Sequence, residues 1–75
     1  MAAKIQSKSG TSEGFEIIAN REGLMELAAA CLQLAMQPED DEQVRQSGNH
    51  THFAEWFNNL EPGCDEFIIT YKPDL

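Results

Sequence analysis

Residues 14–37 read GFEIIANREGLMELAAACLQLAMQ, and this stretch decides the fold. In its first part, Phe15, Ile17 and Ala19 occupy every second position, which is the pattern of a half-buried strand. Asn20 follows and supplies a side-chain oxygen that can cap the first amides of a helix. The stretch therefore predicts a strand that leads directly into a helix.

The helix is expected over residues 21–37, where apolar residues recur every three or four positions. At roughly 100° per residue its apolar side spans about 220°, whereas an ordinary surface helix needs little more than about 100°. One small sheet cannot cover so wide a surface. We therefore expect a loop, the N-terminal residues or a second protein to cover the remainder. Pro38 ends the helix, because proline cannot continue it.

The last third of the chain predicts a β-hairpin. Residues 50–54 alternate in polarity, and residues 66–72 are rich in the Ile, Phe, Thr and Tyr side chains that favour strands. Pro62 and Gly63 lie between them and fit the central pair of a type II turn. The order β-α-β-β predicts an α+β fold, a two-layer sandwich in which one long helix packs on a mainly antiparallel three-stranded sheet.

Residues 1–13 precede this pattern. They are expected to form either a flexible N-terminal arm or an extra edge strand over residues 4–8, in which Ile5 is the only large apolar side chain. Residues 14–75 are expected to form a single α+β domain. A chain of 75 residues buries only about 60% of the surface that its unfolded form exposes, so its stability margin is small.

The charge restricts the class of partner. Thirteen acidic and five basic residues give a formal net charge of −8. Binding to a phosphate backbone needs many Lys and Arg side chains, so a nucleic-acid partner is not expected, and a basic protein partner is favoured. No signal-peptide core or membrane-spanning run is visible, which predicts a cytoplasmic protein. Cys31 and Cys64 are then free thiols, and Cys31 is expected in the helix core.

The residue types suggest two chemical sites, a zinc site and a cysteine nucleophile. His50, His52, Cys64 and Asp65 are four potential zinc ligands, but the sequence does not fix the direction of the turn that carries the last two. Cys64 could also pair with a histidine as a nucleophile, yet no cation or helix start is evident to lower its pKa. We therefore predict no enzymatic activity, no metal and no cofactor.

Three features remain as candidates for binding a partner. On a strand, His50 and His52 share one face, opposite Phe53. Trp56 and Phe57 are adjacent, and adjacent side chains on an extended segment point in opposite directions. One of these two rings is therefore expected to close the core and the other to anchor a partner. An acidic run between the helix and the hairpin could meet a basic partner. The candidate partner-binding residues are His50, His52, Trp56, Phe57, Glu39, Asp40, Asp41 and Glu42.

Three segments together carry a family resemblance, namely the strand and helix start at residues 15–24, the His-Thr-His-Phe strand at residues 50–53, and LEPGCDEFII at residues 60–69. They resemble the immunity protein 32 family of bacterial polymorphic toxin systems. The resemblance covers about residues 14–71. It implies a non-enzymatic protein that binds and neutralises a cognate toxin by occlusion, and the acidic charge favours a basic toxin. The alternative is a small self-associating domain, and a homodimer is compatible with both.

Overall fold

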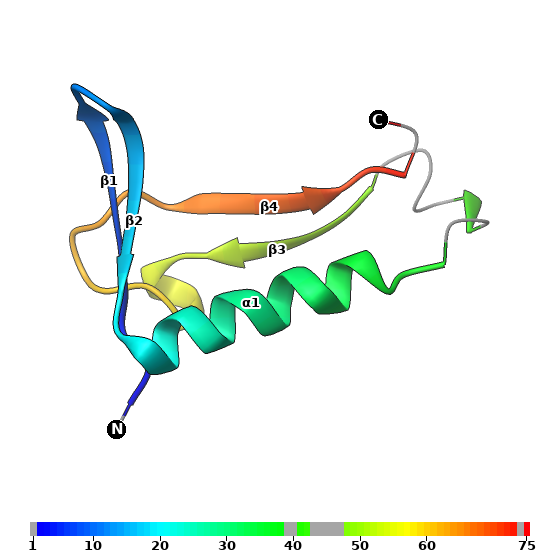
Figure 1. Cartoon of the computed structure of the whole chain (residues 1–75), viewed down its shortest axis with the longest axis horizontal. Coiled ribbons are helices and arrows are strands. Elements are labelled where there is room, and N and C mark those ends of the chain that lie inside the picture. The colour runs from blue at the N-terminus through cyan, green and yellow to red at the C-terminus, as the bar shows by residue number, and fades with distance from the viewer. Residues whose placement is uncertain (1, 39–40, 43–47, 74) are drawn as a thin grey trace.

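The computed structural model describes residues 2–38, 41–42, 48–73 and 75. Within these residues, one α-helix, one short 3-10 helix and four strands form an α+β fold, which confirms the predicted class (Figure 1). The elements are, in order, β1 (Ile5–Thr11), β2 (Gly14–Ala19), α1 (Arg21–Ala35), β3 (Asn49–Phe53), the 3-10 helix η1 (Glu55–Phe57) and β4 (Phe67–Tyr71).

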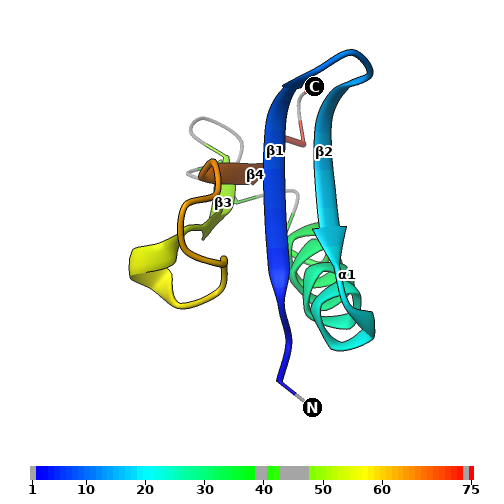
Figure 2. The same ribbon diagram turned by 90° about the vertical axis from the view of Figure 1, so that its left-hand side faces the viewer.

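The strands form two separate antiparallel pairs, β1–β2 and β3–β4, so the predicted single three-stranded sheet is wrong. The physical reason is that β2 finds its hydrogen-bonding partner in the N-terminal residues, with Ile5 opposite Ala19. The β1–β2 hairpin therefore stands across the start of β4 instead of running beside it (Figure 1). In Figure 2, α1 and β2 lie on one side of the β3–β4 pair, and β1 lies between this pair and the other two elements.

β1 supplies the largest fully buried side chain among the described residues, that of Ile5. Ile5 is 2% exposed and Ser7 is 6% exposed, and alternate positions of the strand are open to solvent. Ile5 packs with Phe53 and Leu60 in the core, although it lies about fifty residues before them in the chain. The rings of Phe53 and Phe67 stack at 4.8 Å between centroids and extend this core along β3 and β4.

α1 begins where its capping residue predicts. Asn20 has extended backbone angles, and its side-chain oxygen accepts a 2.8 Å hydrogen bond from the Gly23 amide. The same oxygen accepts a 2.9 Å bond from the Lys4 amide, and the Asn20 amide donates to the Lys4 carbonyl at 3.1 Å. One asparagine thus caps the helix and ties the N-terminal segment to it. The helix ends at Ala35, two residues before its predicted limit, with Met36 as its cap.

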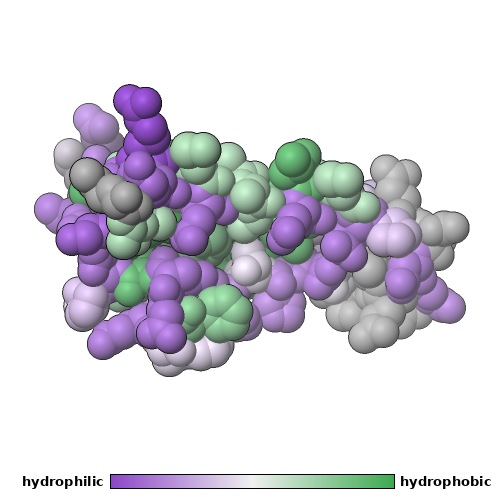
Figure 3. Space-filling model, turned by 90° about the horizontal axis from the view of Figure 1, so that it is seen from below, coloured by the Kyte–Doolittle hydropathy of each residue, from purple (hydrophilic) through white to green (hydrophobic). Residues whose placement is uncertain are grey.

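Much of the apolar surface of α1 faces solvent. Leu24, Met25, Leu32 and Met36 are 53%, 66%, 61% and 74% exposed. Cys31 is also exposed, so its predicted place in the core is wrong, because the sheet reaches only the side of α1 that carries Leu27, Ala30 and Leu34. Viewed from below, the surface is mostly hydrophilic, and hydrophobic side chains gather along one margin (Figure 3).

Candidate partner-binding surface

Four ring side chains form a continuous row on the face of β3 that points away from the core. The ring centroids of His50 and His52 are 4.9 Å apart, and those of His52 and Trp56 are 5.4 Å apart. Trp56 and Phe57 follow at 5.6 Å with nearly perpendicular planes. These residues, His50, His52, Trp56 and Phe57, are called the aromatic row below. The structure brings together all four of the predicted aromatic and histidine candidates.

The alternation of β3 explains the histidine half of the row. Phe53 is 3% exposed and points into the core, and Thr51 shares its side of the strand. His50 and His52 therefore point the other way, as predicted. His50 is exposed and His52 is half-buried.

The second half of the row lies on η1, not on an extended segment as the sequence suggested. Trp56 is 62% exposed and Phe57 is 53% exposed. The expectation that one of them closes the core is therefore wrong. The buried positions fall instead on either side of them, at Ala54 (1% exposed) and Leu60 (6% exposed). These two residues hold η1 against the core and leave both aromatic rings on the surface.

Asn59 fixes η1 to β3. Its side-chain oxygen accepts a 2.8 Å hydrogen bond from the Ala54 amide, and its side-chain nitrogen donates a 2.7 Å bond to the His52 carbonyl. Asn58 before it adopts the left-handed conformation, with φ of 62°, which lets the chain reverse after η1. The exposed rings of the aromatic row thus sit on a backbone that is hydrogen-bonded in place.

Ile68 extends the exposed surface onto β4 and was missed by the sequence reasoning. It pairs with His52 across the sheet and is 56% exposed. The signal that could have found it is the alternation of residues 67–71, combined with a register that places Ile68 opposite His52. The register is set by a long connection, so the sequence pattern alone did not give it.

Of the acidic residues, only Glu55 is adjacent in the chain to a residue of the aromatic row. Glu55 is exposed at the start of η1 and lies next to Trp56 in the chain. Asp41 and Glu42, from the predicted acidic run, are exposed, whereas Glu39 and Asp40 lie outside the described residues.

The possible zinc and thiol sites do not assemble. Within the described part of the chain, no group of three or more His, Cys, Asp and Glu side chains is arranged to hold a metal ion. Cys64 is half-buried and packs against the core. Asp65 is turned to β1, where its carboxylate accepts bonds from the Ser9 hydroxyl at 2.6 Å and the Ser9 amide at 3.1 Å. These bonds, the hydroxyl one first, lower the pKa of Asp65 below its ordinary value.

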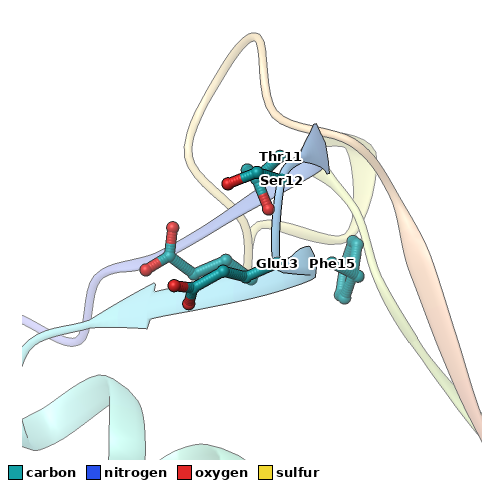
Figure 4. Close-up of a pocket in the computed structure, with 5 residues that line it drawn as sticks. Thr11, Ser12, Glu13 and Phe15 are labelled. Atoms are coloured by element: carbon teal, nitrogen blue, oxygen red, sulfur yellow. The ribbon is translucent and has the colours of Figure 1, made fainter.

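The tip of the β1–β2 hairpin carries a polar hollow of ≈240 Å³ (Figure 4). The Glu13 carboxylate and the Phe15 ring point to different sides of the ribbon there. Small-molecule sites usually span about 300–1,000 Å³ and are mainly apolar. This hollow is lined by hydroxyl and carboxylate groups and one ring, without a histidine, cysteine or lysine, and does not resemble a catalytic pocket. Its lining residues are Thr11, Ser12, Glu13, Phe15 and Glu16.

One of three comparisons with known proteins finds a match. The family model described as immunity protein 32 matches residues 15–72, which is most of the chain and includes the whole aromatic row. No curated protein and no solved structure matches the chain. Among the described residues, none of the helices is long and apolar enough to cross a membrane.

Proposed function

Because the chain belongs to the immunity protein 32 family, we propose that it binds a cognate toxin protein and neutralises it by covering the toxin's functional surface. Immunity proteins act through a protein partner, so the role of a binding protein follows from the family. The identity of the surface does not, and the aromatic row is the feature that best supports a location. We place this activity in the cytoplasm of a bacterium that carries the toxin.

The aromatic row has the properties of an interface centre. Trp and Tyr are strongly enriched among the residues that dominate binding energies, and aromatic rings bury a large area at little entropic cost. Trp56 and Phe57 are more than half exposed, and Asn59 holds their backbone in place. A partner that covers these rings gains contact area without first having to order the loop.

The charge supports a basic toxin. A net charge of −8 on a chain of 75 residues attracts a positively charged protein over a distance of about 8 Å at physiological salt and raises the rate of encounter. Glu55 lies at the aromatic row, and Asp41 and Glu42 belong to the connector that leads towards β3. In this proposal the acidic residues steer the toxin and the aromatic row provides most of the affinity.

Inhibition by coverage is stoichiometric and consumes no substrate. One chain blocks one toxin molecule for as long as the complex lasts, so protection depends on slow dissociation. Nothing in this mechanism requires a bound metal, a nucleophile or a cofactor.

The test is coexpression of the chain with the toxin encoded beside it, combined with a direct binding measurement. We expect the unaltered chain to rescue growth and to bind the purified toxin. Trp56→Ala should weaken binding by about 30-fold or more, since interface centres contribute about 2 kcal/mol or more. Met25→Ala is the matched control, because Met25 is similarly exposed (66%, against 62% for Trp56) but lies on α1.

Two results would count against the proposal in different ways. If the unaltered chain neither rescues growth nor binds the toxin, the function is wrong. If it does both and Trp56→Ala behaves like Met25→Ala, the function stands and the toxin binds elsewhere on the molecule.

A further inference from the structure

The four strands have four outer edges, and two of them are covered by the chain itself. The outer edge of β1 is bonded to the segment after η1: the Ile5 carbonyl accepts a 2.8 Å bond from the Glu61 amide, and the Ser7 hydroxyl donates to the Asp65 carbonyl. The outer edge of β3 is covered at its end by Asn59, which satisfies the His52 carbonyl. The outer edges of β2 and β4 remain.

The outer edge of β4 is open and apolar. Residues 67–71 read FIITY, and among the described residues no segment other than β3 hydrogen-bonds to their backbone. A row of unpaired amides and carbonyls is a template for another strand, and soluble proteins usually protect it with a lysine, a proline or a bulge. β4 has none of these between Phe67 and Tyr71.

An apolar groove lies next to this edge. It has a volume of ≈180 Å³ and lies between α1 and β4. On the helix side it is lined by Cys31, Leu34 and Ala35, and on the strand side by Ile69, Thr70 and Tyr71. Leu24, 53% exposed, lies on the same side of α1 two turns before Cys31, because seven residues span about two helical turns. The open edge of β4 therefore borders an apolar groove against α1.

We propose that this surface binds a second copy of the chain, with β4 pairing antiparallel to β4 of that copy about a two-fold axis at Ile69. In this register Phe67 lies opposite Tyr71 of the second copy, and Ile68 lies opposite Thr70. The two β3–β4 pairs become one four-stranded sheet. Its outermost strands are the two β3 strands, whose outer edges Asn59 covers at the His52 end.

The charges at the two ends of β4 favour a second copy of the chain as the partner. The residues that flank β4 are Glu66 and Lys72, both exposed, and neither forms an ion pair within the described residues. The two-fold register places Glu66 opposite Lys72 of the second copy, and symmetry makes this contact twice. The chain has only five basic residues against thirteen acidic ones, so a lysine in the complementary position is notable. The open edge of β2 offers no such match, since self-pairing about Ile17 would place Glu16 opposite Ile18.

The aromatic row stays accessible in this dimer. It lies on the sheet face that points away from α1, whereas the new contacts run along the strand edge and the groove on the α1 side. The dimer therefore presents two aromatic rows on one sheet face. The inference does not rest on the proposed toxin binding, because it concerns the chain alone.

Sedimentation velocity of the chain by itself, from about 1 to 100 µM, tests the inference. We expect a species of twice the 8.4 kDa chain mass. Glu66→Lys and Lys72→Glu each replace two attractive contacts by two repulsive ones and should weaken association at least about tenfold. The double variant should restore it. An equimolar mixture of the two single variants should form heterodimers, because each then supplies the charges that the other lacks.

Glu26→Lys is the matched control, since it changes the net charge equally on the polar side of α1 and should associate like the unaltered chain. Hydrogen exchange of the Ile68 and Thr70 amides gives a second readout that needs no variant. Ile68 pairs with His52, whose carbonyl bonds to Asn59 on the outer side of β3, so these two amides point away from β3 and we expect their protection to rise with concentration. A chain that stays monomeric over the whole range overturns the proposal. So does a Glu66→Lys variant that associates as well as Glu26→Lys, or amide protection that is independent of concentration.

Discussion

Replacing Gly23 of α1 by alanine should change the free energy of unfolding through two opposing effects. Within a helix, glycine is less favourable than alanine by about 1 kcal/mol, because it loses more backbone freedom on folding. Propensity alone therefore predicts that Gly23→Ala stabilises the protein. The surroundings of Gly23 predict the opposite.

The N-terminal segment passes directly over Gly23. A Cβ atom at this position would lie 2.3 Å from the Lys4 carbonyl oxygen and 3.0 Å from a side-chain carbon of Ile5. The first neighbour is backbone, and it is held by the bond from the Asn20 amide, so it cannot rotate away. Crowding of this kind typically costs about 1–3 kcal/mol, and a shift of Lys4 also strains hydrogen bonds worth about 1 kcal/mol each.

The clash outweighs the propensity gain, so Gly23→Ala should lower the free energy of unfolding by about 2 kcal/mol net. For a domain of this size, that corresponds to a drop in Tm of about 8–16 °C. Urea and thermal unfolding, followed by circular dichroism, measure both quantities.

Ala29→Gly, at an exposed position of α1, is the control that measures the propensity effect alone and should cost about 1 kcal/mol. If Gly23→Ala were instead more stable than the unaltered chain by a similar amount, the close passage of the N-terminal segment over α1 would be refuted.

Three further predictions concern the contacts that hold the loops and β1. Asp65→Asn should remove a pH dependence of stability. The pKa of Asp65 is lowered in the folded state, so its contribution to stability is complete above the ordinary value of 3.8 and is lost as the pH falls through the lower folded value. Unfolding curves of both chains at several acidic pH values measure this difference. Asn59→Ala leaves two backbone groups without their side-chain partner and should cost about 1–3 kcal/mol in urea unfolding, and a loss below about 0.5 kcal/mol would contradict its bridging role. Ile5→Ala empties the centre of the core and should cost about 2–5 kcal/mol, whereas Gln6→Ala, at the neighbouring exposed position, should leave the midpoint nearly unchanged.

The elements that were predicted correctly from the sequence are those determined by residues close together in the chain. Asn20 and the apolar period after it located the start of α1, and the alternation around His52 placed both histidines on the outer face of β3. Gly63 adopts φ of 80°, as a glycine in a Pro-Gly turn should. Each of these features depends on residues only a few positions apart in the sequence.

The features that escaped prediction depend on contacts between distant residues. Ser7 and Ser9 bond to Asp65 across more than fifty positions, and no local pattern signals such a pairing. For this reason the sequence offered an arm or a short edge strand where the structure has the seven-residue β1. The two exposed rings of η1 were misjudged for the same reason, because burial went to Ala54 and Leu60, which are fixed by the core around Ile5.

The bonding of β1 to the segment around residues 61–65 also sets the order of events during synthesis. Ile5 is synthesised about fifty residues before its core partners Phe53 and Leu60. At about 5–20 residues per second, β1 waits several seconds before its outer edge can be satisfied. Contacts of such high sequence separation also slow folding itself. The toxin-binding surface that we propose would therefore form only after the residues around Leu60 have been translated.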